Sequence, residues 1–246
     1  MKKLIIIILV LLILSLGCSP IYYSPNTQNV PLISAKGEKN VSVNAGSSNA
    51  NSLFNSVSVF DMQGSYGLTN SLAIQLNAGF FNVTKNERGG GGNGKLFETA
   101  IGYYVPVNKH FLFETYALLG YGNFKSIVSG PASNTINENI SGSLMRYGIQ
   151  PDFGYKSKNI SLAVSTRLLK LNYFDVSGNL TYEGENQVDY LTQNSSYLLF
   201  EPALTLRAGW KPMKFQLQLG NSYNLTNVSF RQGKTFFTVG IHLNFL

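Results

Sequence analysis

Charge is scarce in this chain, and so are cysteine, tryptophan and histidine. Only 13% of the 246 residues are charged, about half the share that is usual in soluble domains. The single cysteine excludes an intrachain disulfide, and one cysteine with two histidines offers too few ligands for a typical zinc site. The net charge of +7 is not concentrated in any long basic run, so we expect no nucleic-acid partner. We also expect no metal and no cofactor.

Long apolar runs are rare too, and the clearest one lies at the N-terminus. Leu4–Leu14 is uninterrupted, but it is shorter than the about 20 residues that a membrane-spanning helix needs. Lys2 and Lys3 precede it and give the positive start that is typical of an export signal. Residues 1–17 are therefore predicted to be a cleaved signal peptide.

The lone cysteine directly follows this segment. Gly17 and Cys18 resemble the lipobox of bacterial lipoproteins, although Ser15 and Leu16 depart from the commonest Leu-small-Gly-Cys order. The resemblance implies cleavage before Cys18, a diacylglycerol on its sulfur and an acylated amino group. The residue after the cysteine is Ser19, and such lipoproteins carry a serine there when they are sorted to the outer membrane. The alternative is an ordinary secretory signal with an incidental cysteine.

What the sequence has in abundance is alternation. In the last segment, Phe237–Leu246, and in its predicted hairpin partner, Met213–Tyr223, apolar residues alternate with polar residues and glycine. A period of two places the two sets on opposite faces of a strand. One continuous apolar face and one polar face are typical of a strand between lipid and a polar lumen.

Ten segments fit this pattern, and the connections between them alternate in length. Tight turns at one end and long polar loops at the other are typical of an outer-membrane barrel with periplasmic turns and external loops. We therefore predict an all-β, antiparallel, up-and-down transmembrane β-barrel over residues 40–246. If Asn40–Gly46 is not a strand, the barrel has eight strands. A soluble sandwich or a lipocalin-like barrel is the alternative fold. The ten strands are expected at Asn40–Gly46, Ser56–Tyr66, Leu72–Phe81, Leu96–Val105, Phe111–Gly122, Gly142–Tyr155, Ile160–Lys170, Tyr197–Ala208, Met213–Tyr223 and Lys234–Phe245.

Residues 18–39 have no sustained period and are rich in Pro, Asn and Ser. We expect a lipid-anchored periplasmic tether, or a plug that folds under or into the periplasmic mouth. An even strand count places both termini in the periplasm. The sequence of this segment resembles that of a family of uncharacterised barrel lipoproteins from Bacteroidota-type Gram-negative bacteria. The resemblance rests on Tyr23–Asn26, Asn29–Leu32 and Gly37–Glu38, and more weakly on Gly102–Pro106 and Tyr116–Gly122.

Charged residues inside the predicted strands fall on one face, opposite the apolar set. Five acids there meet four permanent bases and one histidine, and the outward face of these strands carries no interior charge. Because unpaired buried charges are costly, Glu98, Glu114 and Glu201 are expected to pair with arginines. We predict a polar, closed interior, with a narrow selective channel as the alternative. The interior network comprises Asp61, Glu98, Glu114, Arg146, Asp152, Arg167, Glu201, Arg207, Lys214 and His242.

The sequence offers few candidate catalytic residues. Barrel enzymes that modify lipid resemble one another in needing a base, usually histidine, at the outer rim or lipid-facing wall. Here His110 falls in a short turn and His242 on the inward face near the periplasmic mouth. We therefore expect a non-catalytic barrel with a structural or surface-interaction role, and an enzyme is the weaker alternative. Expected partners are outer-membrane lipid, the barrel-insertion machinery and an unknown surface ligand or partner protein. The acidic, aromatic loop Asn172–Ser196 is a candidate to bind a cation, a glycan or a protein, although a merely solvated loop is the favoured interpretation.

Overall fold

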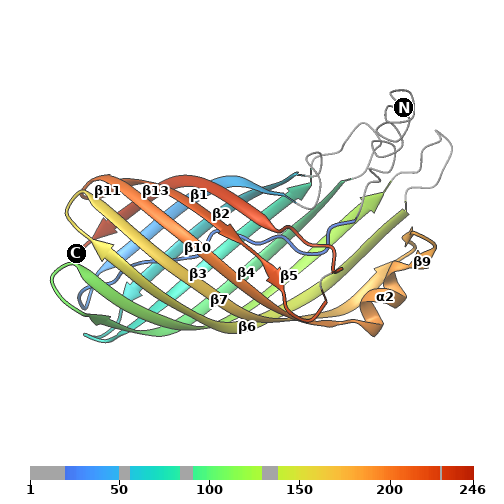
Figure 1. Cartoon of the computed structure of the whole chain (residues 1–246), viewed down its shortest axis with the longest axis horizontal. Helices are drawn as coiled ribbons and strands as arrows, with labels where there is room; N and C mark the ends of the chain where they lie inside the picture. Colours follow the sequence, from blue (N-terminus) through green and yellow to red (C-terminus); the bar gives the residue numbers. More distant parts are fainter. Residues whose placement is uncertain (1–19, 50–55, 84–90, 129–137, 228) are drawn as a thin grey trace, which may run out of the picture.

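The structure is a computed structural model that describes residues 20–49, 56–83, 91–128, 138–227 and 229–246. The predicted signal peptide and Cys18 lie outside the described residues. Within the described ranges, ten long strands close into one antiparallel barrel (Figure 1). Each strand pairs with its neighbour in sequence, and the last strand pairs with the first from Lys39↔Phe245 to Asn49↔Thr235.

The predicted up-and-down barrel is therefore confirmed. The first segment is a full strand that pairs on both sides, so the eight-strand alternative is wrong. The ten barrel strands are β1 (Lys39–Asn49), β2 (Ser56–Gly67), β3 (Leu72–Val83), β4 (Gly91–Pro106), β5 (Phe111–Val128), β6 (Glu138–Lys156), β7 (Ile160–Gly178), β10 (Ser196–Trp210), β11 (Met213–Asn221) and β13 (Thr235–Phe245).

Several strands run further toward the long loops than the sequence predicted. β5, β6 and β7 have 18, 19 and 19 residues, well beyond the 9–11 that a tilted crossing needs. The added residues bring polar side chains such as Asn123 and Lys125 onto the outward face, so the outward apolar row ends while backbone pairing continues. The segment predicted as the loop Asn172–Ser196 also contains β8 (Thr181–Tyr182), β9 (Glu185–Asn186) and the helix α2 (Gln187–Gln193). β12 (Tyr223–Asn224) adds a short pairing to β10.

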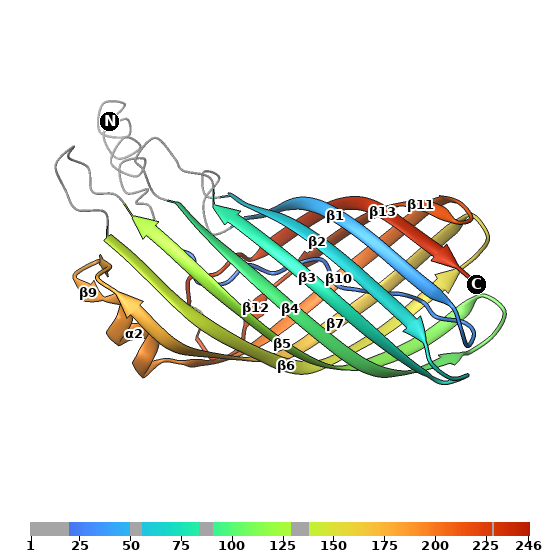
Figure 2. The ribbon, with the colours of Figure 1, turned by 180° about the vertical axis from the view of Figure 1, so that it is seen from behind.

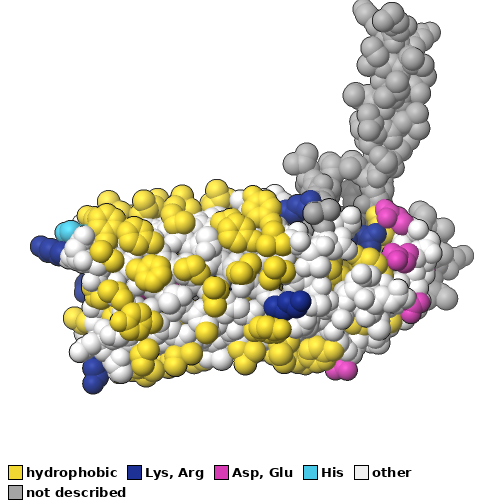
Figure 3. All heavy atoms as spheres, turned by 60° about the horizontal axis from the view of Figure 1, so that its bottom comes forward, with side chains coloured by type: hydrophobic (Ala, Val, Ile, Leu, Met, Phe, Trp, Pro, Cys, Tyr) yellow, Lys and Arg dark blue, Asp and Glu magenta, His cyan; other side chains and the backbone are white. Residues whose placement is uncertain are grey.

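Apolar side chains cover the outside of the barrel. Figure 3 shows them over the visible wall, and Leu76 and Phe215 are 64% and 65% exposed. This is the surface that an apolar solvent would cover. In the part of the chain that the structure describes, no helix is long and apolar enough to cross a membrane.

The outward face is not free of charge, which corrects the sequence analysis. Lys95, Lys125 and Lys170 all lie on the outward face of strands that are longer than predicted. Lys95 and Lys125 lie near the long-loop ends of β4 and β5, and Asn93 pairs with Lys125 across them. A basic residue costs about 0–1 kcal/mol near a membrane interface and about 2–4 kcal/mol at the midplane. The two lysines therefore mark where the apolar band ends.

The buried core lies inside the barrel rather than between layers. The chain from Pro20 to Glu38 passes through the lumen, as the dark blue segment in Figure 2 shows. It crosses from the long-loop end to the short-turn end, where β1 begins. The C-terminus lies at the short-turn end (Figure 1). The sequence predicted that the chain begins and ends on the same side of the barrel. In the structure the first described residues lie at the long-loop end, opposite the C-terminus.

Candidate functional site: the barrel lumen

Residues 22–33 fill the lumen, and we call them the plug. Every one of them is buried. At the long-loop end the Tyr22 amide donates to the Arg231 carbonyl at 3.0 Å, and the Gly233 amide donates to the Tyr23 carbonyl at 2.9 Å. Beyond the other end of the plug, the Gly37 amide donates to the Gly67 carbonyl at 2.8 Å. The chain is thus hydrogen-bonded to barrel backbone at both mouths, to a long loop at one and to the end of β2 at the other.

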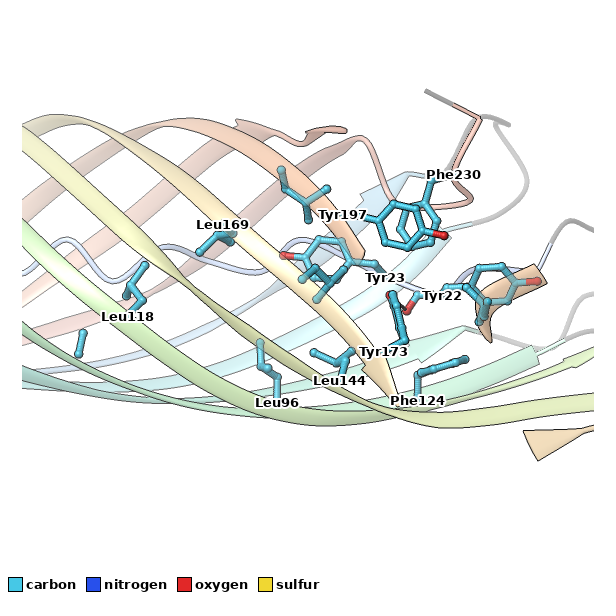
Figure 4. Close-up of a cluster of buried hydrophobic side chains, with 14 of the residues drawn as sticks. Tyr22, Tyr23, Leu96, Leu118, Phe124, Leu144, Leu169, Tyr173, Tyr197 and Phe230 are labelled. Carbon is cyan, nitrogen blue, oxygen red and sulfur yellow. Dashed lines mark hydrogen bonds between the residues drawn. The ribbon is translucent and has the colours of Figure 1, made fainter. Parts of the chain in front are cut away.

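An aromatic cluster closes the long-loop mouth around Tyr22 (Figure 4). The Tyr22 ring lies 5.9 Å from Phe124 and 6.1 Å from Phe230, and Phe230 stacks on Tyr197 at 3.9 Å. The Tyr173 hydroxyl donates to the Tyr22 carbonyl at 3.0 Å. Such ring pairs add about 0.5–1.5 kcal/mol each beyond their buried area. The aromatic rings therefore pack around the start of the plug, while the Tyr22 amide, carbonyl and hydroxyl each keep a hydrogen-bond partner.

A buried ion cluster lies deeper in the lumen. Arg146 and Arg167 approach Glu98 at 2.7 and 3.6 Å, with all three side chains at most 1% exposed. Arg146 also donates to the Tyr23 hydroxyl at 2.9 Å, and both arginines donate to the Asn26 amide oxygen, at 3.0 and 3.2 Å. A buried ion pair is stable only when its remaining donors find acceptors. Tyr23 and Asn26 of the plug supply acceptors to Arg146, and Asn26 also accepts from Arg167.

Two other lumen carboxylates also bind the plug. Asp61 accepts from the Thr27 amide at 3.1 Å, the Thr27 hydroxyl at 2.6 Å and the Asn26 side chain at 3.2 Å. Glu201 accepts from the Tyr23 hydroxyl at 2.9 Å and from Ser222 at 2.8 Å. Asp61 is thus stabilised through both of its oxygens without a basic partner, and Glu201 through one.

Uncharged lumen side chains bind the middle of the plug. The Gln28 amide donates to Gln218 at 2.6 Å, and the Gln28 side chain donates to the Glu201 carbonyl at 2.7 Å. Asn29 donates to Asn77 at 2.8 Å and accepts from Gln150 at 2.7 Å through its carbonyl. The extended plug makes no regular sheet pairing here, so these side chains replace the missing backbone partners.

Near the short-turn mouth, Glu114 holds the plug backbone. Its two oxygens accept from the Leu32 and Ile33 amides at 3.0 and 2.6 Å. Leu32 has a φ of +53°, a left-handed conformation that is strained for a leucine. Successive amides turned in this way form a concave anion site. The Leu32 side chain lies against Gly154, where an added Cβ would come within 2.6 Å of it.

A second carboxylate, Glu38, lies in the turn just before β1 and outside the membrane-spanning strands. It pairs with Lys156 and accepts from the Ser34 amide at 2.8 Å. Lys156 also donates to the Leu32 carbonyl at 2.7 Å. Burial acts to raise the pKa of Glu38, but the Lys156 ammonium and the Ser34 donors outweigh it and hold that pKa below the ordinary value.

The structure places all ten residues of the predicted interior network on the inward face and buries them: Asp61, Glu98, Glu114, Arg146, Asp152, Arg167, Glu201, Arg207, Lys214 and His242. It brings Glu98 together with two arginines, as expected. The expected pairing of Glu114 and Glu201 with arginines is wrong, since both bind the plug.

The remaining members of the network also find uncharged partners. Arg207 donates to the Val30 carbonyl at 2.7 Å, and Asp152 accepts from Gln150 at 3.0 Å. Lys214 donates to the Ser157 carbonyl at 3.0 Å, and His242 shares a 2.8 Å hydrogen bond with Ser42. Alternation identified the lumen side of this site and missed the plug side. The available signal was the polar run Asn26–Asn29, flanked by tyrosines and by Val-Pro-Leu-Ile.

Groups that could carry out a reaction are few. Among the described residues, no three His, Cys, Asp or Glu side chains gather as metal ligands would. The predicted acidic and aromatic loop turns partly inward, because Gln187 and Leu191 are buried and the Tyr22 hydroxyl donates to Gln187 at 2.6 Å. The arrangement as a whole can fill and seal a lumen.

Comparisons with known proteins concern the fold alone. No protein-family model and no curated protein matches the chain. Among solved structures, the translocator domain of autotransporter NalP from Neisseria meningitidis is 11% identical, with a TM-score of 0.49 over 86% of this chain and 89% of that chain. An outer membrane channel from Pseudomonas putida is 11% identical, with a TM-score of 0.42 over 89% of this chain and 100% of that chain. A major outer membrane protein from Thermus thermophilus is 12% identical, with a TM-score of 0.42 over 84% of this chain and 99% of that chain.

Proposed function

We propose that this chain is a plugged outer-membrane β-barrel lipoprotein that does no catalysis and conducts no solute. One observation carries the proposal: residues 22–33 are buried without a gap and bind lumen side chains along their length. A barrel with such an interior serves as a structural element or presents its long loops to a partner. The long loops are external and the tight turns periplasmic, as the loop asymmetry indicates.

Lipidation at Cys18 is part of this proposal and rests on the lipobox resemblance. It makes outer-membrane lipid the first partner, and the barrel-insertion machinery the second. Metabolic palmitate labelling that is lost in Cys18→Ser, with heat-modifiable migration retained, supports an acylated barrel. Labelling that persists in Cys18→Ser rules out Cys18 as the acylated residue.

A narrow channel is the second candidate, and the lumen itself favours it. The ten inward charged or titratable residues would line a water-filled passage if the plug left. The two candidates therefore differ in whether the plug moves, and a lock on the plug separates them. The Thr27 and Thr238 hydroxyls lie 3.1 Å apart, so Thr27→Cys with Thr238→Cys would join the plug to β13 by a disulfide.

Planar-bilayer conductance of three proteins tests the proposal. We expect no conductance from the wild type or from the oxidised double variant, and conductance steps from a variant that lacks residues 20–33. Heat-modifiable migration shows which preparations are folded. Wild-type conductance that the disulfide abolishes supports the channel with a mobile plug. Conductance that persists in the oxidised double variant overturns the sealed lumen altogether.

An enzyme that modifies lipid is the weakest candidate. Its test is the mass of lipid A from cells that overproduce the protein. A mass change that is absent in an empty-vector control would overturn the non-catalytic proposal.

A further inference from the structure

We propose that the N-terminal end of the mature chain emerges from the barrel on the long-loop side. The acyl group at Cys18 would then anchor the protein in the leaflet beside those loops, which is the outer leaflet. This proposal rests on the acylation of Cys18 and the external position of the long loops given above. It replaces a periplasmic anchor with one on the cell surface.

The first step is where the described chain begins. Ile21 and Tyr22 line a hollow together with Val83, Asn93 and Lys125, at the long-loop ends of β3, β4 and β5. Lys125 and its neighbour across the pair, Asn93, are also where the outward apolar band gives way to polar residues. Ile21 therefore lies at the level of the membrane interface on that side.

The second step is that the plug cannot slide back. From Tyr23 to Ile33 its groups bind side chains of β2, β3, β5, β6, β7, β10 and β11. The ion cluster holds Tyr23 and Asn26, and Glu114 holds Ile33. A shift by one residue would break every one of these hydrogen bonds at once. Each broken bond to a charged group costs about 1.5–3 kcal/mol.

The third step is the distance that the chain can span between Pro20 and Cys18. Cys18 precedes Pro20 by two residues, which span at most about 7 Å when fully extended. The apolar band of a barrel is about 25 Å tall. With Pro20 at the long-loop mouth, Cys18 has too little chain to return to the short-turn interface. Its acyl chains can enter the leaflet at the long-loop end and not the other.

Three tagged full-length proteins in intact cells test this topology. An epitope is inserted between Ser19 and Pro20, in the loop between β5 and β6, or after Leu246. We expect antibody to label the first two in intact cells and the third only after the outer membrane is permeabilised. Protection of the Ser19 tag while the β5–β6 tag is labelled would overturn the proposal.

The outcomes separate this proposal from those on which it rests. Absence of palmitate labelling in the wild-type protein would overturn acylation, and with it the anchor, while the Ser19 tag still reports the side of the N-terminus. If the Ser19 and β5–β6 tags are both protected and the Leu246 tag is labelled, the proposed orientation fails and the outer-leaflet anchor fails with it. The shared side of the N-terminus and the long loops would then still hold.

The disulfide-locked protein guards against an insertion that displaces the plug. Thr27→Cys with Thr238→Cys is combined with the Ser19 tag and oxidised, which fixes the plug in the lumen. We expect the locked protein to label to the same extent as the unlocked one. Labelling that falls to background on locking would show that the tag had been exposed by an altered path, and would overturn the proposal.

Discussion

At the scale of single residues, the buried charges of the lumen are stabilised by polar groups more than by each other. Glu114 illustrates this, since its two oxygens accept from two successive amides. The sequence placed Glu114 inward through its alternation with Phe113 and Thr115. It did not reveal the partner, because the partner is backbone from a segment 81 residues away in the chain.

Replacing Glu114 by glutamine should destabilise the protein. Glutamine offers one acceptor oxygen and turns an NH₂ group toward the second amide, so one charged hydrogen bond is lost, worth about 1.5–3 kcal/mol. Urea unfolding in lipid or detergent measures the change. Glu185→Gln is the matched control, because Glu185 is exposed. Equal stabilities for the two variants would contradict the role given to Glu114.

Glu38 predicts a pH dependence with a definite sign. Its pKa in the folded protein is lower than the ordinary value. Its contribution to the free energy of unfolding is therefore complete above the unfolded pKa of about 4.3. That contribution is lost as the pH falls through the lower, folded value. Glu38→Gln should therefore be less stable than wild type at about pH 7, and the difference should shrink toward about pH 3. A difference that grows on acidification would contradict this assignment.

At the scale of elements, a barrel strand and the plug are specified by different means. A strand is recognisable by its period of two, and the ten predicted strands match the ten barrel strands in position. The plug has no period, because it is extended and surrounded on all sides by lumen side chains. The extension of β5 and β6 beyond the apolar band also cannot be recognised in the sequence, because backbone pairing there no longer requires apolar residues.

Space for the plug is a property of the strands around it, and Gly154 on β6 tests this. Gly154→Ala would place a Cβ 2.6 Å from the Leu32 side chain and 3.0 Å from Ala163. Overpacking of this kind costs about 1–3 kcal/mol. Gly64→Ala on β2 is the control, since its nearest neighbouring atom is 4.0 Å away. Unfolding free energies should drop for the first variant and stay within about 0.5 kcal/mol for the second.

At the scale of the whole molecule, the plug and barrel form one hydrogen-bonded unit. A cut in the exposed turn at Lys36 should therefore leave the N-terminal fragment in place. We expect a protein with a site-specific protease site after Lys36 to keep this fragment through native size-exclusion chromatography after cleavage. Heating in SDS should release it. Release without heating would show that the covalent link, rather than the lumen contacts, retains the plug.

The sequence by itself determined the barrel fold and the inward position of the charged residues, whereas the pairing of β1 on both sides decided between ten and eight strands. Alternation is a local property, and one face must meet lipid while the other does not. Only the tertiary structure decided what fills the lumen and on which side the described chain begins. Those depend on contacts between residues far apart in sequence, such as Tyr23 with Glu201 and Thr27 with Thr238, and no local period records them.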